Sequence, residues 1–148
     1  MKKKLMIIGP VVLLVALFAV KTFVLAPPPP DEKKLATEPG LTYTMPESFV
    51  VNLADGGESP HFAKVGVALR FSKLSEGEVT PGEGDTPDHV EGAAELRDIV
   101  IATLQSKTSG ELSGVEGRDD VKKKIVERVN KQTDLKILDV YYTEFAVQ

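Results

Sequence analysis

The sequence lacks several residue types on which catalytic and metal sites depend. Its 148 residues include no cysteine, no tryptophan and only two histidines, His61 and His89. The absence of cysteine excludes disulfide bonds, thiolate nucleophiles and thiolate metal ligands. Neither histidine belongs to a zinc-binding pattern such as HExxH. We therefore expect a protein that is not an enzyme and that holds no cofactor or metal ion.

Basic residues are also scarce over most of the chain. The formal net charge is −4, and the first 30 residues hold four lysines and none of the 22 acidic residues. The remaining chain is therefore strongly acidic. An acidic surface repels phosphate backbones and anionic headgroups, so we expect no binding to nucleic acid. A protein partner or a second copy of the chain is the better expectation.

A long apolar run sets the first 26 residues apart from the rest. Lys2–Lys4 precede it, and from Leu5 to Leu25 a helix would measure about 31 Å, enough to cross a hydrocarbon core of about 30 Å. We predict a single transmembrane anchor at residues 1–26, which also contacts membrane lipid. The lysines should keep the N-terminus in the cytoplasm and the rest exported. Representative positions of this anchor are Leu5, Val12, Leu14, Phe18 and Phe23.

A cleaved signal peptide is the alternative for this segment. Val24-Leu25-Ala26 loosely fits the small-residue pattern that precedes a cleavage site. Pro27–Pro30 follow directly, and we expect these prolines to obstruct cleavage, which favours a retained anchor. They also begin a Pro-rich stretch, residues 27–44, that we predict to be an extended stalk. A disordered linker is the alternative beyond Pro30.

Alternating apolar residues predict the strands of a small α+β domain at residues 45–148. Ser48–Leu53 and His61–Phe71 read as two strands, and the turn signal Asp55-Gly56-Gly57 joins them into an antiparallel hairpin. A third strand, Lys136–Gln148, is apolar on both alternating sets, which is typical of a strand covered on both sides. The Gly- and Pro-rich residues 72–92 predict a flexible loop.

Apolar residues at helical spacing predict three helices between the second and third strands. The first begins near Ala93 and ends before Ser109. A short helix follows, within two capping-box patterns headed by Thr108 and Ser113, and a longer one covers Gly117–Gln132. The expected order is β-β-α-α-α-β, with the helices packed on one face of the sheet.

No group of residues has the spacing of a catalytic, phosphate-binding or metal site. Asp85, Asp88 and Glu91 lie close together but miss the pattern of a calcium-binding loop, so solvated loop carboxylates are the simpler interpretation. Arg97-Asp98 and Gly117-Arg118 lie near helix starts. Their simpler interpretation is helix capping and local ion pairing, and the functional alternative is a subunit interface.

Several separated segments resemble the flagellar basal-body-associated FliL family. The ending Val140–Gln148, VYYTEFAVQ, is similar to a V-Y-F-T-E-F-x-x-Q string that commonly closes members of this family. Upstream, Phe49–Leu53 resembles the family's first strand, and Lys64-Val65 its second. The helical motifs "RD…L…KT" and "L…EGR…IN" of the family resemble segments of this chain in the same order: Arg97–Val100 with Leu104 and Lys107-Thr108, then Leu112, Glu116–Arg118 and Val129-Asn130.

The resemblance covers residues 45–148 and departs from the family in two places. A short acidic segment is usual where this chain has residues 72–92, and His61–Lys64 replace a commoner R-Y-L-K type of sequence. Any contact that the family makes through these two regions does not transfer directly to this chain.

The resemblance implies a non-enzymatic, single-pass protein of the cytoplasmic (inner) membrane with its domain on the periplasmic side. The domain would be similar to the stomatin/prohibitin (SPFH) scaffold and would form homo-oligomeric rings. It would associate with the stator MotA–MotB and the MS-ring region of the basal body, supporting torque generation, flagellar rotation, chemotaxis, motility and swarming. Candidate interface residues are Arg97, Asp98, Arg118 and Glu144. The alternatives are a stomatin-like membrane organiser not tied to flagella and an exported enzyme.

Overall fold

The computed structural model describes residues 30–57, 59–81 and 87–148. By its internal contacts the chain divides into two units, Met1–Asp31 and Glu32–Gln148, and the helices and strands of the described residues all lie in the second. The predicted transmembrane anchor, residues 1–26, lies outside the described residues. None of the helices in the described ranges is both long and apolar enough to cross a membrane.

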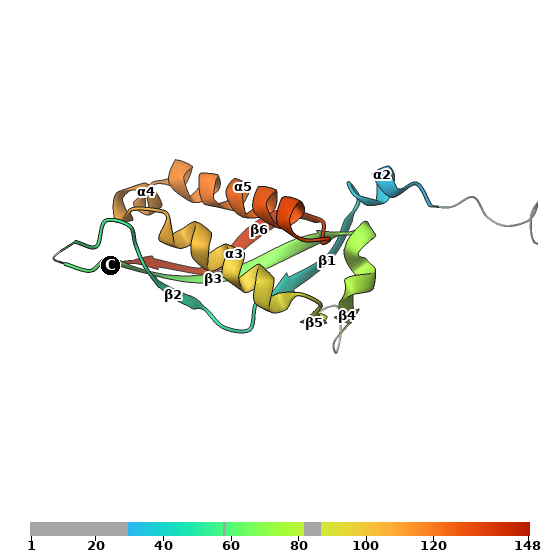
Figure 1. Ribbon diagram of the computed structural model, residues 1–148, viewed down its shortest axis with the longest axis horizontal. Coiled ribbons are helices and arrows are strands. Elements are labelled where there is room, and N and C mark those ends of the chain that lie inside the picture. The colour runs from blue at the N-terminus through green and yellow to red at the C-terminus, as the bar shows by residue number, and fades with distance from the viewer. Residues whose placement is uncertain (1–29, 58, 82–86) are drawn as a thin grey trace, which may run out of the picture. The chain divides into compact units, whose positions relative to one another are not determined.

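A β-sheet built around one central strand is the framework of this unit (Figure 1). The central strand β3 (Phe62–Ser72) pairs along one side with β6 (Ile137–Val147). Its other side pairs first with β2 (Phe49–Asn52) and further along with β1 (Pro39–Thr44). All three pairings are antiparallel. The predicted hairpin of Ser48–Leu53 and His61–Phe71 is therefore confirmed as β2 and β3. β6 forms one outer edge of the sheet, and β1 and β2 form the other.

The register of these strands arranges side chains in rows across the sheet. Phe49 is opposite Val65, and Val65 is opposite Phe145; this row faces the core. The neighbouring row, Val50, Lys64 and Ala146, points to the opposite face, where Val50 is 68% exposed. The sheet therefore has one face that is buried and one that is solvated, as an antiparallel sheet allows.

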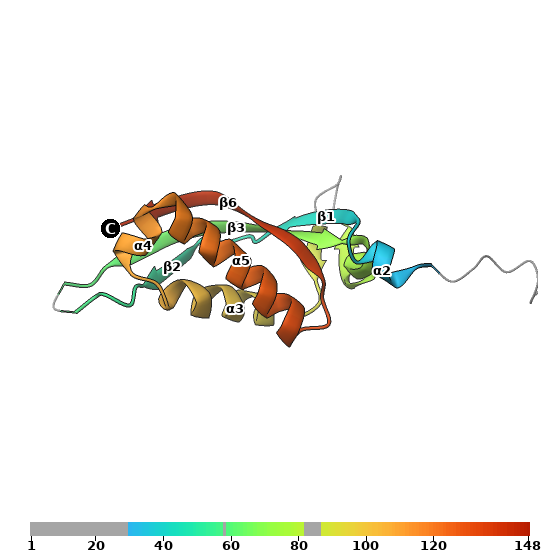
Figure 2. The same ribbon diagram turned by 90° about the horizontal axis from the view of Figure 1, so that it is seen from above.

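Helices cover only one face of the sheet (Figure 2). They are α3 (Ala93–Gln105), the short α4 (Ser109–Ser113) and α5 (Val115–Gln132). The predicted α+β architecture, with helices on one face, is confirmed. Helix α3 packs near β2 and α5 packs on β6, because apolar residues three and four positions apart form one stripe on each helix. The fully buried members of these stripes are Leu96, Val100, Leu104, Val121, Ile125 and Val129.

The two predicted capping boxes have different outcomes. In the first, the backbone N–H of Glu111 donates to the Thr108 hydroxyl at 3.2 Å, and the Glu111 carboxylate accepts from the Thr108 N–H at 2.9 Å, as predicted. The second is wrong, because the Ser113 hydroxyl donates to the Ser109 carbonyl instead. Gly114 is the N-cap of α5, so this helix begins two residues before the predicted Gly117.

The predicted stalk, residues 27–44, is wrong from Glu32 onward. Residues 32–35 form the helical turn α2 (Glu32–Leu35), and β1 then pairs with the end of β3. The side chains of Tyr43 and Met45 are almost fully buried, with Leu41 packed against the same core. The alternation of these three apolar residues was a strand signal, but the preceding Pro39-Gly40 argued for a linker.

The predicted flexible loop, residues 72–92, is also wrong in the ranges that the structure describes. It contains a 3₁₀ helix, η1 (Lys73–Glu78), and two short strands, β4 (Val79–Pro81) and β5 (Pro87–Val90), which pair antiparallel. Val79 and Val90 lie opposite each other and are buried in the core. The predicted order β-β-α-α-α-β therefore omitted β1, β4 and β5. β4 and β5 have only three and four residues, too few to show an apolar period.

The third predicted strand is present, but its environment differs from the prediction. Within the described residues β6 pairs only with β3, and Tyr141 is 41% exposed. The strand is an edge strand, not one that is covered on both sides. Gln148 exchanges both backbone hydrogen bonds with Phe62, at 2.8 and 2.9 Å, so the pairing of β6 with β3 continues to this residue.

Candidate functional site

The hydroxyl, carboxylate and imidazole groups of Ser109, Asp55 and His61 form one cluster. The Ser109 hydroxyl donates to Asp55 Oδ2 at 2.6 Å, and the Ser109 backbone N–H donates to the same carboxylate at 2.9 and 3.0 Å. These bonds hold the pKa of Asp55 below its usual value. His61 Nδ1 lies 3.3 Å from Asp55 Oδ2. The sequence does not reveal this cluster, because Asp55 and Ser109 are 54 residues apart.

The order of groups in this cluster is not that of a nucleophilic triad. In such a triad the imidazole lies between the serine and the carboxylate, so that it can take the serine proton. Here the carboxylate lies in the middle and accepts directly from the hydroxyl. The cluster therefore fastens the turn between β2 and β3 to the start of α4. In the described ranges, no group of three His, Asp or Glu side chains could hold a metal ion.

A buried lysine joins the three helices. Lys107 follows α3, only 7% of its side chain is exposed, and its ammonium contacts Asp120 at 2.7 Å and Glu111 at 3.1 Å. The hydrogen bond to Asp120, and to a smaller extent the one to Glu111, raises the pKa of Lys107 above its ordinary value. Asp120 also contacts Lys124 at 3.0 Å. The ion pairs connect α3, α4 and α5, so Lys107 has a structural role that its motif alone did not reveal.

Two of the four candidate interface residues, Arg97 and Asp98, lie on α3. The Arg97 guanidinium lies 4.5 Å from the centre of the Phe49 ring and 3.3 Å from the Glu47 carboxylate, so it connects α3 to β2. Asp98 is exposed, and no interaction of its side chain is seen in the described part of the chain. Arg97 thus has an intramolecular role, but through residues far along the chain and not through the helix capping or local ion pairing of its simpler interpretation. Asp98 is open to a partner.

The other two candidates, Arg118 and Glu144, lie on α5 and β6. Arg118 lies 5.5 Å from the centre of the Phe145 ring, and its carbonyl accepts from the Tyr142 hydroxyl at 3.0 Å. Burial raises the pKa of this tyrosine. Glu144 accepts from Lys64 at 2.6 Å and from Ser48 at 2.8 Å. The two residues hold α5, β6 and β3 together, and a role for either in an interface stays a prediction.

The outer edge of β6 is occupied near its beginning. The amide side chain of Asn130 accepts from the Ile137 N–H at 2.8 Å and donates to the Ile137 carbonyl at 3.0 Å, as a residue of a neighbouring strand would. The Asp139 carboxylate accepts from the Val140 N–H at 2.8 Å. Interruptions in the register with β3 occur near Leu138 and near Thr143. Such features protect sheet edges against uncontrolled strand addition.

Replacement of Asn130 by alanine should lower the free energy of unfolding by about 2 kcal/mol, since two part-buried hydrogen bonds are lost at about 1 kcal/mol each. Urea unfolding of the purified full-length chain measures this change. Lys131→Ala, an exposed neighbour on the same helix turn, should stay within about 0.5 kcal/mol of the wild type. Equal stability of the Asn130→Ala variant and the wild type would show that the amide does not hold this edge.

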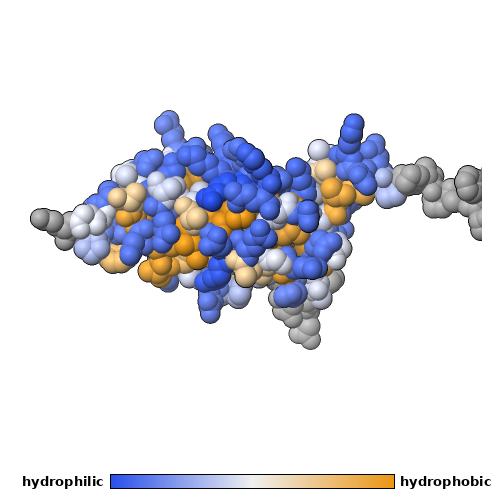
Figure 3. Space-filling model, viewed as in Figure 1, coloured by the Kyte–Doolittle hydropathy of each residue, from blue (hydrophilic) through white to orange (hydrophobic). Residues whose placement is uncertain are grey.

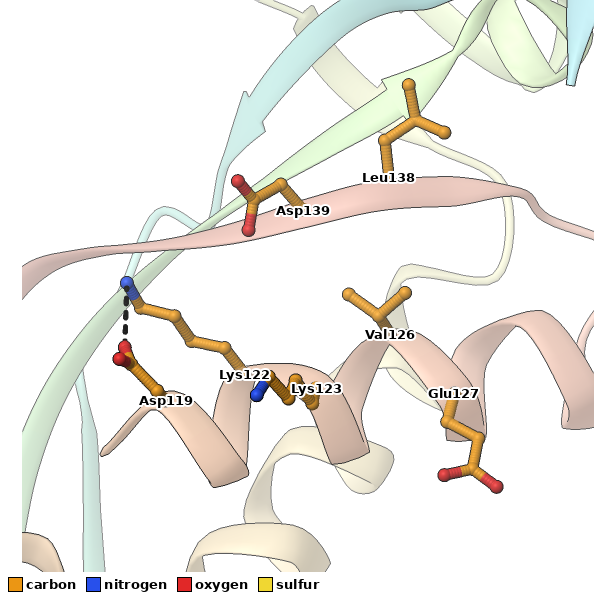
Figure 4. A pocket seen from close by; sticks show the side chains of 7 residues that line it. All are labelled: Asp119, Lys122, Lys123, Val126, Glu127, Leu138 and Asp139. Carbon is orange, nitrogen blue, oxygen red and sulfur yellow. Dashed lines mark ion pairs between the residues drawn. The ribbon is translucent and has the colours of Figure 1, made fainter. Parts of the chain in front are cut away.

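A groove of about 430 Å³ lies beside this edge, between α5 and β6 (Figure 4). Val126 and Leu138 form its apolar part, and charged side chains surround them. Lys122 contacts Asp119 at 3.9 Å, whereas Lys123 is exposed and shows no ion pair in the described ranges. Elsewhere on this helix-bearing face hydrophilic residues dominate, with apolar residues between them (Figure 3). The groove suits a protein surface better than a small substrate, because it is open and holds no converging catalytic groups.

Comparison with known proteins finds a matching family and a similar protein. The model of the family described as "Flagellar basal body-associated protein FliL" matches residues 42–148. A "Flagellar protein FliL" from Aquifex aeolicus (strain VF5) is 30% identical over 112 residues, which cover 75% of this chain and 63% of the relative. The chain therefore aligns with less than two thirds of that relative's length.

The matched region covers most of the folded unit, from within β1 to Gln148. It contains β2, β3 and β6, the helices α3, α4 and α5, and β1 from its fourth residue onward. The motifs that suggested the resemblance hold the contacts described above: Lys107 joins the helices, Arg118 packs on Phe145, and Asn130 covers the edge of β6. The family is one of flagellar accessory proteins and is not known for catalysis. The chain belongs to the family of flagellar basal-body-associated FliL proteins.

Proposed function

We propose that this chain is a non-enzymatic scaffold of the flagellar basal body that associates with the stator MotA–MotB near the MS ring and supports torque generation. The match of the FliL family to residues 42–148 carries the proposal, because it spans the sheet and all three helices that cover it. The open groove between α5 and β6 is consistent with a surface that binds proteins.

The proposed location is the cytoplasmic membrane, with the chain anchored by residues 1–26 and the folded unit outside. The apolar run and its preceding lysines support this location. Self-association into a ring is a further part of the proposal. It is supported by the resemblance to SPFH-type scaffolds and by an exposed sheet edge that includes Tyr141.

Isolation of the tagged full-length chain from membranes in mild detergent tests the association with the stator. Both stator subunits should co-purify with it, and deletion of the gene should reduce swimming most in viscous medium, where the load on the motor is highest. The matched control is the same isolation from cells whose stator genes are deleted. Normal motility at high load, together with the absence of stator subunits from the purified material, would contradict the proposed role.

A further inference from the structure

We propose that the folded unit docks on the membrane surface through the end that holds α2 and η1, with the side chain of Leu74 inserted among the lipid headgroups. This inference rests on the membrane anchor of the proposed function, residues 1–26, and identifies the part of the folded unit that meets the lipid. The short connection between the anchor and α2, the position of α2 in the fold and the exposure of Leu74 support it.

Only the five residues 27–31 separate the predicted anchor from α2. An extended chain covers at most about 3.6 Å per residue, so the distance from Ala26 to Glu32 cannot exceed about 22 Å. The headgroup region on one side of a bilayer takes up about 5–8 Å of this distance. The start of α2 is therefore held within about 15 Å of the membrane surface, much closer than a stalk over residues 27–44 would have allowed.

α2 and η1 lie at one end of the central strand, and α4 lies at the other (Figure 1). η1 directly follows β3, and its Lys73 binds Glu38 beside α2 through an ion pair of 3.1 Å and a backbone hydrogen bond of 3.0 Å. Ser109 of α4 donates to Asp55, in the turn that precedes β3. The 11 residues of β3 measure about 36 Å, more than the connection to the anchor can span. The connection is thus long enough to bring the α2–η1 end to the membrane and too short to turn the α4 end toward it.

Leu74 is the apolar side chain that this end offers to lipid. It is 43% exposed, and no other large apolar side chain of α2 or η1 is exposed in the structure. The preceding Lys73 is held by Glu38, which fixes the position of Leu74 relative to α2. Leucine side chains insert into the boundary between headgroups and acyl chains. A single leucine binds lipid weakly, but the short connection gives this end a high effective concentration at the surface, so a weak contact suffices.

The charges of this end do not attract anionic lipid. α2 has one glutamate and two lysines, and η1 has two glutamates and one lysine. Asp31 and Glu38 flank α2, so five carboxylates stand against three ammonium groups, and Glu38 is paired with Lys34 and Lys73. Because basic clusters are what draw proteins to anionic headgroups, the contact should form on uncharged phosphatidylcholine and gain nothing from added anionic lipid.

Two glycines are matched sites for a fluorescent label, because the natural chain has no cysteine. Gly77 follows Leu74 by three residues in η1, so the two positions lie on the same side of this 3₁₀ helix. Gly110 lies in α4, at the other end of the unit. A methyl group at either glycine would meet no atom within 4 Å. The full-length Gly77→Cys and Gly110→Cys chains would each carry the label and be incorporated into phosphatidylcholine vesicles.

The label at position 77 should be quenched by brominated lipid and shielded from iodide, whereas the label at position 110 should be quenched by iodide alone. Leu74→Asp in the Gly77→Cys chain should remove the quenching by brominated lipid. Insertion of about 20 Gly and Ser residues after Pro30 should reduce the docked population about tenfold, because effective concentration falls roughly as the −3/2 power of the length of a linker. The substituted positions are exposed, so the folded unit should remain intact, and circular dichroism of each variant checks this.

Equal quenching of the two labels by iodide would overturn the docking. Shielding of the label at position 77 from iodide without quenching by brominated lipid would indicate a contact with protein, and would overturn it as well. An alkaline wash of the vesicles separates these results from the proposed function. Release of the chain by the wash would contradict the anchor itself, whereas a retained chain with both labels equally open to iodide would leave the anchor and the scaffold role standing.

Discussion

The Gly117→Ala variant should lose about 3 kcal/mol of its free energy of unfolding, or fail to fold. A methyl group at this position would overlap the carbonyl oxygen of Glu111 and come within 2.7 Å of its carbonyl carbon. Both atoms belong to the backbone of α4, so no side chain can rotate away to make room. Insertion of a methyl group into such a contact typically costs about 1–3 kcal/mol, and a rigid backbone partner places this position at the upper end.

Gly110→Ala is the matched control, because a methyl group there would meet no atom within 4 Å. Gly110 lies within α4, where alanine is the better helix former, so this variant should be as stable as the wild type or slightly more stable. Thermal unfolding of the two full-length variants measures the difference. Equal melting temperatures for Gly117→Ala and the wild type would show that α4 and α5 are not in this close contact.

The Lys107→Met variant should be about 2 kcal/mol less stable than the wild type. Methionine preserves most of the buried stem but removes the ammonium that contacts Asp120 and Glu111. Hydrogen bonds to charged groups contribute about 1.5–3 kcal/mol, and the loss of two of them is partly offset because both carboxylates can be solvated. Lys123→Met, an exposed lysine on α5, should change the stability by less than about 0.5 kcal/mol. Urea unfolding at pH 7 measures both.

The same network should give the wild type a defined dependence of stability on pH. The Thr108 N–H and then Lys107 lower the pKa of Glu111 from 4.5, and Lys107 and then Lys124 lower the pKa of Asp120 from 3.8. Lowered carboxylate pKa values stabilise the fold above these ordinary values, and the stabilisation is lost as the pH falls through the lower folded values. The raised pKa of Lys107 has the opposite sign: its stabilisation is complete below 10.5 and is lost as the pH rises above that value.

Measurement of the free energy of unfolding of the wild type and of Lys107→Met from acid to alkaline pH separates the effect of the Lys107 charge from that of its packing. The wild type should have a plateau of stability from about pH 5 to pH 10, with a loss on either side. In Lys107→Met the acid loss should be shallower, because Asp120 no longer has its strongest partner, and the loss that Lys107 itself causes above pH 10 should be absent. The same loss of stability at low pH in the wild type and in Lys107→Met would show that Lys107 does not interact with these carboxylates in solution.

The strands and helices that could be predicted from sequence are those with a regular apolar period. Phe49 with Val51 on β2, and Leu96 with Val100 on α3, repeat at two and at four residues, and each forms the predicted element. β4 and β5 have one buried valine each, Val79 and Val90, which is too few to define a period. Their pairing depends on the core that the remaining elements build.

The contacts of the candidate interface residues could not be predicted from sequence either. Arg97, Arg118 and Glu144 could be selected from their motifs, but the sequence does not show that each has a partner within the chain. Phe49 and Glu47 are about 50 residues from Arg97, and Lys64 is 80 residues from Glu144. The Asp55 and Ser109 contact was missed for the same reason.

The sequence by itself determined the acidic composition, the absence of cysteine chemistry, the alternation of strands and helices, and the membership of the FliL family. Each of these depends on local composition or on the order of residues along the chain. Tertiary structure alone decided that β6 is an edge strand, that Asn130 covers its beginning and that Lys107 joins three helices. The physical reason is that each of these features depends on segments far apart in sequence. The position of a strand in the sheet, a buried ion pair and the bonds of a side chain to a strand edge exist only once the sheet and its helices have packed.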